Sequence, residues 1–220
     1  METRSKATDK PLPARAQRSH DAIVAAATTE FLDRGFDRTT MDEIAVAAAV
    51  SKQTVYAHFA SKEALFLEVI RTATSAGTDR VQSGVDFDAA VIDPERTLLD
   101  FAERQLRVVS DPRLLKLRRL VVAEVPRFPE LGRALHAAGP ARAIEGLQRL
   151  FMRFRDEGLL AIADPAADAA LFNWLLMGEP LNNASLFGDD SYPSGAAIKV
   201  HATNVVALFA AARRRASPQA

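Results

Sequence analysis

The chain of 220 residues contains no cysteine. Disulfide bonds, thiol nucleophiles and thiolate metal sites are therefore excluded, and a reducing cytoplasm is compatible with this composition. No apolar run approaches the roughly eighteen residues that a helix needs to span a bilayer, so we expect no membrane segment. The polar N-terminus has no apolar stretch of the secretory type, so we expect no signal peptide and a cytoplasmic location.

The sequence also lacks the motifs of common enzyme classes. Its ten glycines are spaced for neither a dinucleotide-binding fingerprint nor a nucleophile elbow. Its histidines are scattered, with no second histidine or carboxylate at ligand spacing on the same predicted helix. We therefore expect no enzymatic activity, no cofactor and no metal site.

The charge is balanced, with 28 basic and 28 acidic side chains and a formal net charge of zero. This balance argues against a large non-specific footprint on nucleic acid. Residues 1–20 carry a local excess, with five basic against two acidic side chains. We interpret residues 1–14 as a disordered arm, which either reaches into a DNA minor groove or is a solvated tail.

What the sequence does contain is a close series of helix start signals. Thr40 and Glu43 have the spacing of a capping box, which predicts a helix from Met41. Ser51 and Ser61 are two further N-cap candidates. Three helices are therefore expected in quick succession, after a first helix over residues 14–34.

The helix predicted over residues 52–58 turns Val55 and Phe59 inward at i, i+4 spacing. Two short helices joined by a tight turn form the helix-turn-helix pattern. The outer face is polar and partly cationic, so it can enter a DNA major groove and offer side chains to base edges. The other interpretation is a small helical subdomain with a solvated face. The side chains on or near this face are Lys52, Gln53, Thr54, Tyr56 and His58.

A longer ordered set of elements spans residues 18–70. It comprises Ile23 to Ala27 with Phe31, Gly35-Phe36, Thr39-Thr40, Ile44-Ala45, Val50-Ser51, Val55 to Phe59 and Ser61 to Leu65. This set resembles the DNA-binding domain of the TetR family of bacterial transcription repressors.

The resemblance implies which side chains contact DNA. Lys52, Gln53 and Thr54 would reach base edges or the groove, with His58 in the same recognition helix. Thr40, Tyr56 and Lys62 match positions that contact phosphates in the family. The alternative is a helical interaction module that has lost DNA binding.

The rest of the chain shows helical periodicity and no strand pattern. It is predicted to be a helical bundle. The helix after Asp111 is apolar on most sides, which is typical of a central position. Gly139-Pro140 and Gly178-Glu179-Pro180 predict interruptions of their helices. Asp-Pro pairs predict three helix starts, at residues 93–94, 111–112 and 164–165.

The segment from Val121 to Leu135, with Gly139 to Ala143, is similar to the C-terminal domain of the AefR-like subgroup of the TetR family. The resemblance implies a ligand pocket in this half of the chain. It also implies a dimer in which the last two long helices pair with their copies, and Val206 is expected there. The helices concerned lie near residues 165–185 and 196–214.

Candidate pocket residues are polar or aromatic side chains among apolar neighbours, namely Arg104, Arg118, Glu124, Asn173, Trp174 and Asn182. Met177, an apolar residue of adaptable shape at helical spacing from Trp174, is a further candidate. Each also has a structural interpretation, such as Trp174 in the core or an ion pair between Arg118 and Glu124.

These observations predict an all-α protein. Residues 15–60 form a helix-turn-helix DNA-binding domain, and residues 61–220 form a helical domain for effector binding and dimerisation. The function they indicate is a homodimeric repressor that binds a palindromic double-stranded DNA operator. A small, largely hydrophobic effector is expected to release it.

Overall fold

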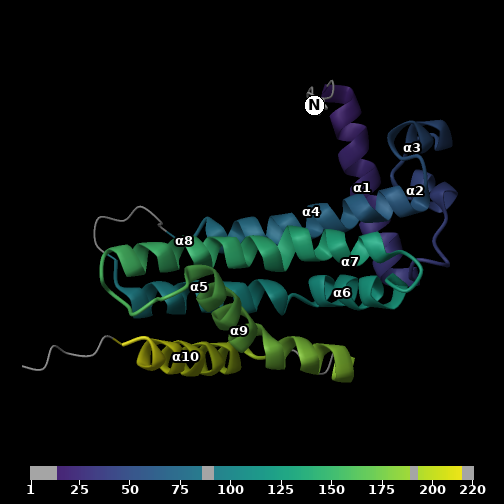
Figure 1. Cartoon of the computed structure of the whole chain (residues 1–220). Coiled ribbons are helices and arrows are strands. Elements are labelled where there is room, and N and C mark those ends of the chain that lie inside the picture. Colours follow the sequence, from purple (N-terminus) through teal and green to yellow (C-terminus); the bar gives the residue numbers. More distant parts are fainter. Residues whose placement is uncertain (1–13, 86–91, 189–192, 215–220) are drawn as a thin grey trace, which may run out of the picture. The chain divides into compact units, whose positions relative to one another are not determined.

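The structure is a computed structural model that describes residues 14–85, 92–188 and 193–214. The predicted arm lies outside these residues, apart from Ala14. Throughout the described ranges every regular element is a helix, which confirms the all-α class (Figure 1). The chain divides into two compact units, Met1–Val69 and Ile70–Ala220, and each is described by itself.

The first unit contains the helix-turn-helix, and its helices begin where the sequence signals place them. Thr40 Oγ1 accepts from Glu43 N at 3.2 Å while Glu43 Oε2 accepts from Thr40 N at 2.9 Å, so the predicted capping box is present. Ser51 Oγ accepts from Thr54 N at 3.1 Å, and Ser61 caps the next helix. The helices are α1 (Ala14–Arg34), α2 (Met41–Ala47), α3 (Lys52–His58) and the first part of α4 (Lys62–Gln82).

Three phenylalanine rings form the centre of the first unit. The ring centroids of Phe31 and Phe66 lie 4.8 Å apart, and those of Phe36 and Phe66 lie 5.2 Å apart. Gly35 allows Phe36 to fold back on α1, because its φ of +83° lies in the left-handed region that glycine adopts without strain. The same core buries Val55 and Phe59, as the helical spacing of α3 predicts.

The turn between α2 and α3 contains a strained residue. Ala49 has a φ of +52°, which is costly for a residue with a Cβ. The turn is closed by a hydrogen bond from Val50 N to Ala45 O at 3.0 Å. This closed turn sets the path of the chain from α2 into α3.

The second unit is a bundle in which all three predicted Asp-Pro starts are present. Asp93, Asp111 and Asp164 each accept hydrogen bonds from backbone N–H groups of the following helix. The remainder of α4 belongs to this unit. Its other helices are α5 (Pro94–Val109), α6 (Pro112–Glu124), α7 (Pro129–His136), the π-helical turn η1 (Ala137–Ala141), α8 (Arg142–Asp156), α9 (Pro165–Phe187) and α10 (Gly195–Ala212).

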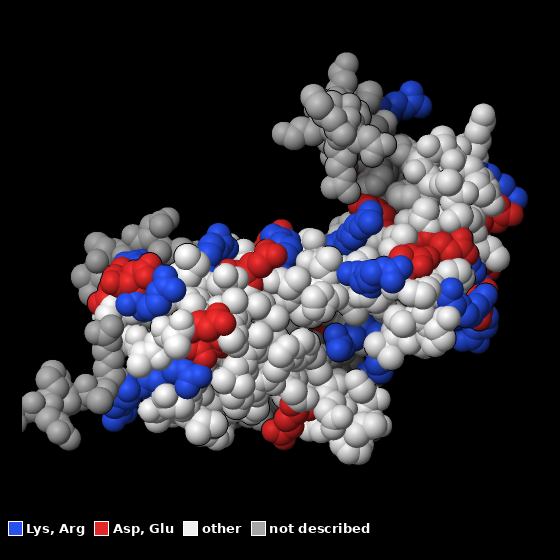
Figure 2. All heavy atoms as spheres, viewed as in Figure 1, with Lys and Arg blue, Asp and Glu red and all other residues white. Residues whose placement is uncertain are grey.

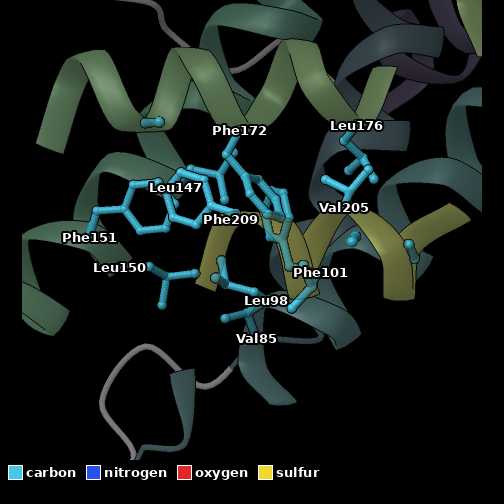
Figure 3. Packing of buried hydrophobic residues seen from close by; sticks show 14 of the residues in the cluster. Val85, Leu98, Phe101, Leu147, Leu150, Phe151, Phe172, Leu176, Val205 and Phe209 are labelled. Carbon is cyan, nitrogen blue, oxygen red and sulfur yellow. The ribbon is translucent and has the colours of Figure 1, made fainter. Parts of the chain in front are cut away.

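The core of the bundle lies between α5, α8, α9 and α10 (Figure 3). Phe151 of α8 stacks on Phe209 of α10 with centroids 5.1 Å apart. Phe172 of α9 meets the same Phe209 ring edge-on at 5.2 Å. Phe101 of α5 is fully buried in the same cluster. Four helices therefore share one aromatic centre.

The expected central position of α6 is wrong. Its buried side chains are Leu115, Leu117 and Val121, whereas Val122 is 59% exposed. The apolar composition of α6 is therefore misleading about its place in the bundle. Some of its apolar side chains line a cavity, and others face solvent.

Gly139-Pro140 does not interrupt its helix as predicted. Helices α7 and α8 run on through η1 as one continuous rod (Figure 1). Arg142 N bonds to Gly139 O, three residues earlier, and not to Ala138 O, which would be its acceptor in an α-helix. The Ala138 carbonyl is therefore available to another donor. Thr78 Oγ1 of α4 donates to that carbonyl at 3.0 Å, so a side chain from another helix satisfies the altered backbone.

Pro180 likewise lies inside a continuous α9, so the predicted interruption there is also wrong. Proline has no N–H to donate to Leu176 O, four residues earlier. His201 Nε2 of α10 lies 2.9 Å from that carbonyl. A carbonyl only accepts, so His201 donates through Nε2 and replaces the missing bond.

Helix α10 bears on the expectation that no segment of the chain is long and apolar enough to span a membrane. Its 18 residues have a mean hydropathy of 1.4, which is long and apolar enough for a membrane span by length and composition. The expectation that no segment approaches that limit was therefore too strict. A core helix passes the same test, and α10 buries Ile198, Ala202, Val205, Val206 and Phe209 in the bundle.

Candidate functional site

The outer face of α3 presents two unoccupied polar side chains. Gln53 is exposed, and Tyr56 is 54% exposed. Neither has a hydrogen-bond partner within residues 14–85, 92–188 and 193–214. Both side chains are therefore free to contact another molecule.

Other predicted DNA contacts already have partners in the first unit. Lys52 Nζ lies 2.5 Å from Asp42 Oδ2, which joins α3 to α2. The hydroxyl groups of Thr54 and Ser51 lie 2.8 Å apart at the start of α3. Thr40 is occupied by its capping box. These contacts fix the position of α3, and the two ends of the Lys52 pair remain exposed to exchange with solvent or phosphate.

Lys62 holds the segment between α1 and α2. Its Nζ donates to Phe36 O at 2.8 Å, Thr39 O at 3.0 Å and Asp37 O at 3.4 Å, and lies 4.4 Å from the Phe36 ring centroid. An ammonium has three donors, so all of them are used by backbone carbonyls. Lys62 therefore positions the residues before α2.

His58 is half-buried and packs against α1. Its ring centroid lies 6.0 Å from that of His20 in an edge-on arrangement. His20 in turn contacts Asp21 Oδ1 through Nδ1 at 3.3 Å, and this contact is the main cause that lowers the pKa of the Asp21 carboxyl. These contacts give His58 a packing role within the first unit.

Charge in the first unit is locally neutralised. The hydrogen bonds from Thr40 hold the pKa of the Glu43 carboxyl below its ordinary value, and Arg34 Nη1 lies 2.5 Å from Glu43 Oε1. On the face of the molecule in Figure 2, Lys and Arg side chains are interspersed with Asp and Glu. No broad basic surface is therefore visible on this face.

The second unit contains a cavity of about 100 Å³. Its walls come from α4, α5, α6, the α7–η1–α8 rod and α9, and they are mainly apolar. Such a space between helices, with few polar groups, is typical of a small-molecule site.

Four of the seven predicted pocket residues line this cavity: Arg118, Asn173, Trp174 and Met177. Asn182 is not part of the lining. Arg104 does not line it, since its guanidinium lies over Gly84. Glu124 is also outside the lining and pairs with Arg127 at 3.7 Å, so it forms no ion pair with Arg118.

The sequence interpretation missed several polar residues of the cavity. Gln105 Nε2 donates to Asn173 Oδ1 at 2.8 Å, and both side chains are buried. Gln105 occupies the apolar stripe of α5, next to Leu106, so a polar residue on an inward face was the available signal. Thr74, Thr78 and Gln82 of α4 also line the cavity, and their sequence context carries no comparable signal.

No group of three or more His, Asp or Glu side chains suited to a metal ion occurs within the described parts of the chain. The geometry shows a helix-turn-helix with free side chains on its second helix, and a mainly apolar cavity in a helical bundle. This combination is typical of helix-turn-helix regulators, in which a helical body accompanies the helix-turn-helix unit.

Comparison with known proteins identifies the family. Residues 23–69 match the model for bacterial regulatory proteins of the tetR family, and residues 96–214 match the model for the C-terminal domain of AefR-like transcriptional repressors. The chain belongs to the TetR family of DNA-binding transcriptional regulators. The members of this family are regulators and not enzymes.

Solved structures agree along most of the chain. A TetR-family regulator of Mesorhizobium loti MAFF303099 is 36% identical with a TM-score of 0.85, covering 91% of this chain and 99% of that one. The flavonoid-responsive regulator FrrA is 31% identical with a TM-score of 0.74, covering 93% and 100%.

Among curated relatives, the transcriptional activator FasR of Mycolicibacterium smegmatis is 43% identical over 63 residues, which is 29% of this chain. The match spans 27% of FasR, and the match to YdeS of Bacillus subtilis spans 32% of that protein. The chain therefore matches less than a third of the length of either of these curated relatives.

Proposed function

We propose that this chain is a homodimeric repressor that binds a palindromic operator and is released by a small, largely hydrophobic effector. Residues 15–60 bind DNA, and residues 61–220 bind the effector and form the dimer, in the cytoplasm. One observation carries the proposal. A single chain combines an α3 whose Gln53 and Tyr56 are free with an apolar cavity inside its helical body.

Repression is favoured by the body of the chain. The model that matches residues 96–214 is described as that of a repressor. The similarity to FasR, an activator, extends over 63 residues only. A short match of that kind does not distinguish the two modes of regulation, so the longer match carries the argument.

On DNA, α3 would lie in the major groove with Gln53 toward a base edge and Tyr56 toward a phosphate. Lys52 and Thr54 would contact the groove from the start of α3. Thr40, His58 and Lys62 complete the proposed site, and their internal contacts suggest that they act largely by holding α3 in place.

Dimer formation is supported by exposed apolar side chains on α9 and α10. Val200 and Leu208 are about 60% exposed and share one face of α10, eight residues apart. Large exposed apolar patches mark association sites. Val206, which the sequence placed in the interface, is 5% exposed and belongs to the core, so Leu208 replaces it in the proposal. The exposed apolar side chains of α9 that lie outside the cavity lining are Leu171, Leu186 and Phe187.

A dimer would present two α3 helices to successive major grooves about 34–36 Å apart, which matches a palindromic operator.

The cavity wall includes part of α4, and α4 is one helix from Lys62 to Gln82. An effector that favours a dimer with another head spacing lowers DNA affinity by its differential affinity for the two states. FrrA, a similar protein, is described as a flavonoid-responsive regulator, so a small-molecule effector is consistent with that relative.

The DNA-binding part is tested by selecting binding sequences from a random duplex pool and measuring mobility shifts. Gln53→Ala is expected to relax preference at one base position by about 1–3 kcal/mol. Tyr56→Phe is expected to weaken binding to all sequences alike, by about 0.5–1.5 kcal/mol, because it removes one hydroxyl from a phosphate. A chain that has lost DNA binding would retain no sequence from the pool.

The effector part is tested through Trp174, the only tryptophan, which lines the cavity and is 46% exposed. A compound that enters the cavity should change its fluorescence and release the operator with one shared concentration dependence. A compound that releases DNA without changing the emission would remove Trp174 from the effector site.

A further inference from the structure

The cavity of the second unit is apolar but not uniformly so. Among its lining residues, within the parts of the chain that the structure describes, Arg118 of α6 is the one charged side chain. No Asp or Glu accompanies it in that lining. Arg118 is therefore the one charge that the described lining contributes to the cavity.

Arg118 has no partner in the described residues, either an ion pair or a hydrogen bond. Burial lowers the pKa of its guanidinium, because no negative group offsets the loss of water. Arginine nevertheless remains protonated at neutral pH. A partly buried cation without a counter-ion is costly, and its attraction for an anion is stronger than it would be in water.

Two further polar atoms of the lining residues are buried without partners. Gln105 uses Nε2 to bond Asn173, while its Oε1 accepts nothing, and the hydroxyl oxygen of Thr74 is also unpartnered. Buried polar groups are rarely left unpaired, and those that are require an explanation. The Thr74 hydroxyl can donate to an anionic oxygen of a ligand, whereas Gln105 Oε1 only accepts and requires a donor such as a ligand hydroxyl or N–H group.

We propose that the effector is a small organic carboxylate, with its apolar body in the cavity and its carboxylate oxygens paired with Arg118. The proposal rests on the effector function proposed above and specifies its chemical class. The planar guanidinium donates two parallel hydrogen bonds to a carboxylate, which gives both charge and orientation. A cationic compound would meet a repulsive charge, and a neutral one would leave Arg118 unpaired.

The size of the cavity limits the apolar body. A cavity of about 150 Å³ in another protein accommodates benzene, whereas this one is about 100 Å³. A ligand with a ring or an alkyl chain must therefore either displace the walls or extend out of the cavity beside the exposed Trp174. Small acids with one ring or a single chain are accordingly the appropriate probes.

The test measures binding to the full-length protein by calorimetry, in the absence of DNA. Each acid is compared with its neutral amide and its cationic amine on the same skeleton. The sets are benzoate, benzamide and benzylamine; cinnamate, cinnamamide and cinnamylamine; octanoate, octanamide and octylamine. We expect at least one acid to bind about tenfold or more tightly than its amide, with no binding of its amine.

The variant Arg118→Gln should remove this preference, so that acid and amide bind alike, while Arg118→Lys should retain part of it. Lys116→Gln is the matched control, because it removes the same charge from α6 outside the cavity lining. Since Arg118 has no internal partner, Arg118→Gln should leave the thermal midpoint of the protein unchanged or raised. A clear fall in that midpoint would show that Arg118 has a structural partner.

Failure of all three acids to bind, equal binding of acid and amide, or unchanged acid binding in Arg118→Gln would each overturn the proposal. None of these results depends on the operator. Loss of the proposed function would show separately, as a protein that binds an acid selectively but does not bind DNA or is not released from it.

Discussion

The two compact units of this chain differ in how their helices are specified. In the first unit, α2, α3 and α4 begin at side-chain caps from Thr40, Ser51 and Ser61, each within three residues of the N–H group it binds. In the second unit, α9 continues through Pro180, where His201 of α10 bonds the Leu176 carbonyl, and the π-helical turn that contains Pro140 has its Ala138 carbonyl bonded by Thr78 of α4. Local signals therefore specify the first unit, and contacts distant in sequence override them in the second.

The largest expected effect on stability comes from comparing a core position with a surface position of α10. Val206→Glu should destabilise the bundle by several kcal/mol, because it places an unpaired charge among buried side chains. Leu208→Glu, on the exposed face two residues away, should retain the fold and give monomers with weakened operator binding. Thermal unfolding followed by circular dichroism, with sedimentation, measures both. A folded Leu208→Glu dimer with normal DNA binding would exclude Leu208 from the interface.

The second prediction concerns the proline inside α9. His201→Ala should cost about 1–3 kcal/mol of unfolding free energy, because the Leu176 carbonyl loses its donor. In a Pro180→Ala background the new N–H of residue 180 can take over that carbonyl, so the same change should cost less. Chemical denaturation of the four proteins in this cycle measures the coupling.

Glu179→Gln is the control for this cycle, since Glu179 lies 3.9 Å from His201 but is largely exposed. It should change stability little. Equal costs of His201→Ala in both backgrounds would mean that His201 does not replace the bond that proline removes.

The third prediction tests the local signals of the first unit. Thr40→Ala removes the cap of α2 and should cost about 0.5–2 kcal/mol, whereas Thr40→Ser should be close to neutral. Urea denaturation monitored by circular dichroism measures the difference. Equal stability of the alanine and serine variants would show that the capping box contributes nothing to α2.

The smallest expected effect is a gain. Ala49→Gly should stabilise the protein by roughly 0.5–1 kcal/mol, because relief of the positive φ outweighs the added freedom of the unfolded chain. Ala48→Gly is the neighbouring control, since Ala48 has a φ of −80° and should lose stability on the same change. The midpoints of thermal unfolding should therefore move in opposite directions.

Features that depend on residues close in sequence were predicted correctly, and features that depend on distant contacts were not. The bounds of α1 and α3 and the capping box at Thr40 were predicted correctly, because each depends on residues within one or two helical turns. The interruptions expected at Pro140 and Pro180 were wrong. A π-helical turn carries the backbone past Pro140, and His201, which is distant in the chain, replaces the bond that Pro180 removes.

By itself the sequence determined the helical class, the family and the start of nearly every helix, since caps, periodicity and motif order are local properties. Only the tertiary structure decided that Arg118 and Gln105 meet at one cavity while Arg104 and Glu124 do not, and that Val206 is core while Leu208 is surface. The physical reason is that apolar spacing identifies which side of a helix is buried, but the neighbouring helices determine whether that side meets a core or a cavity.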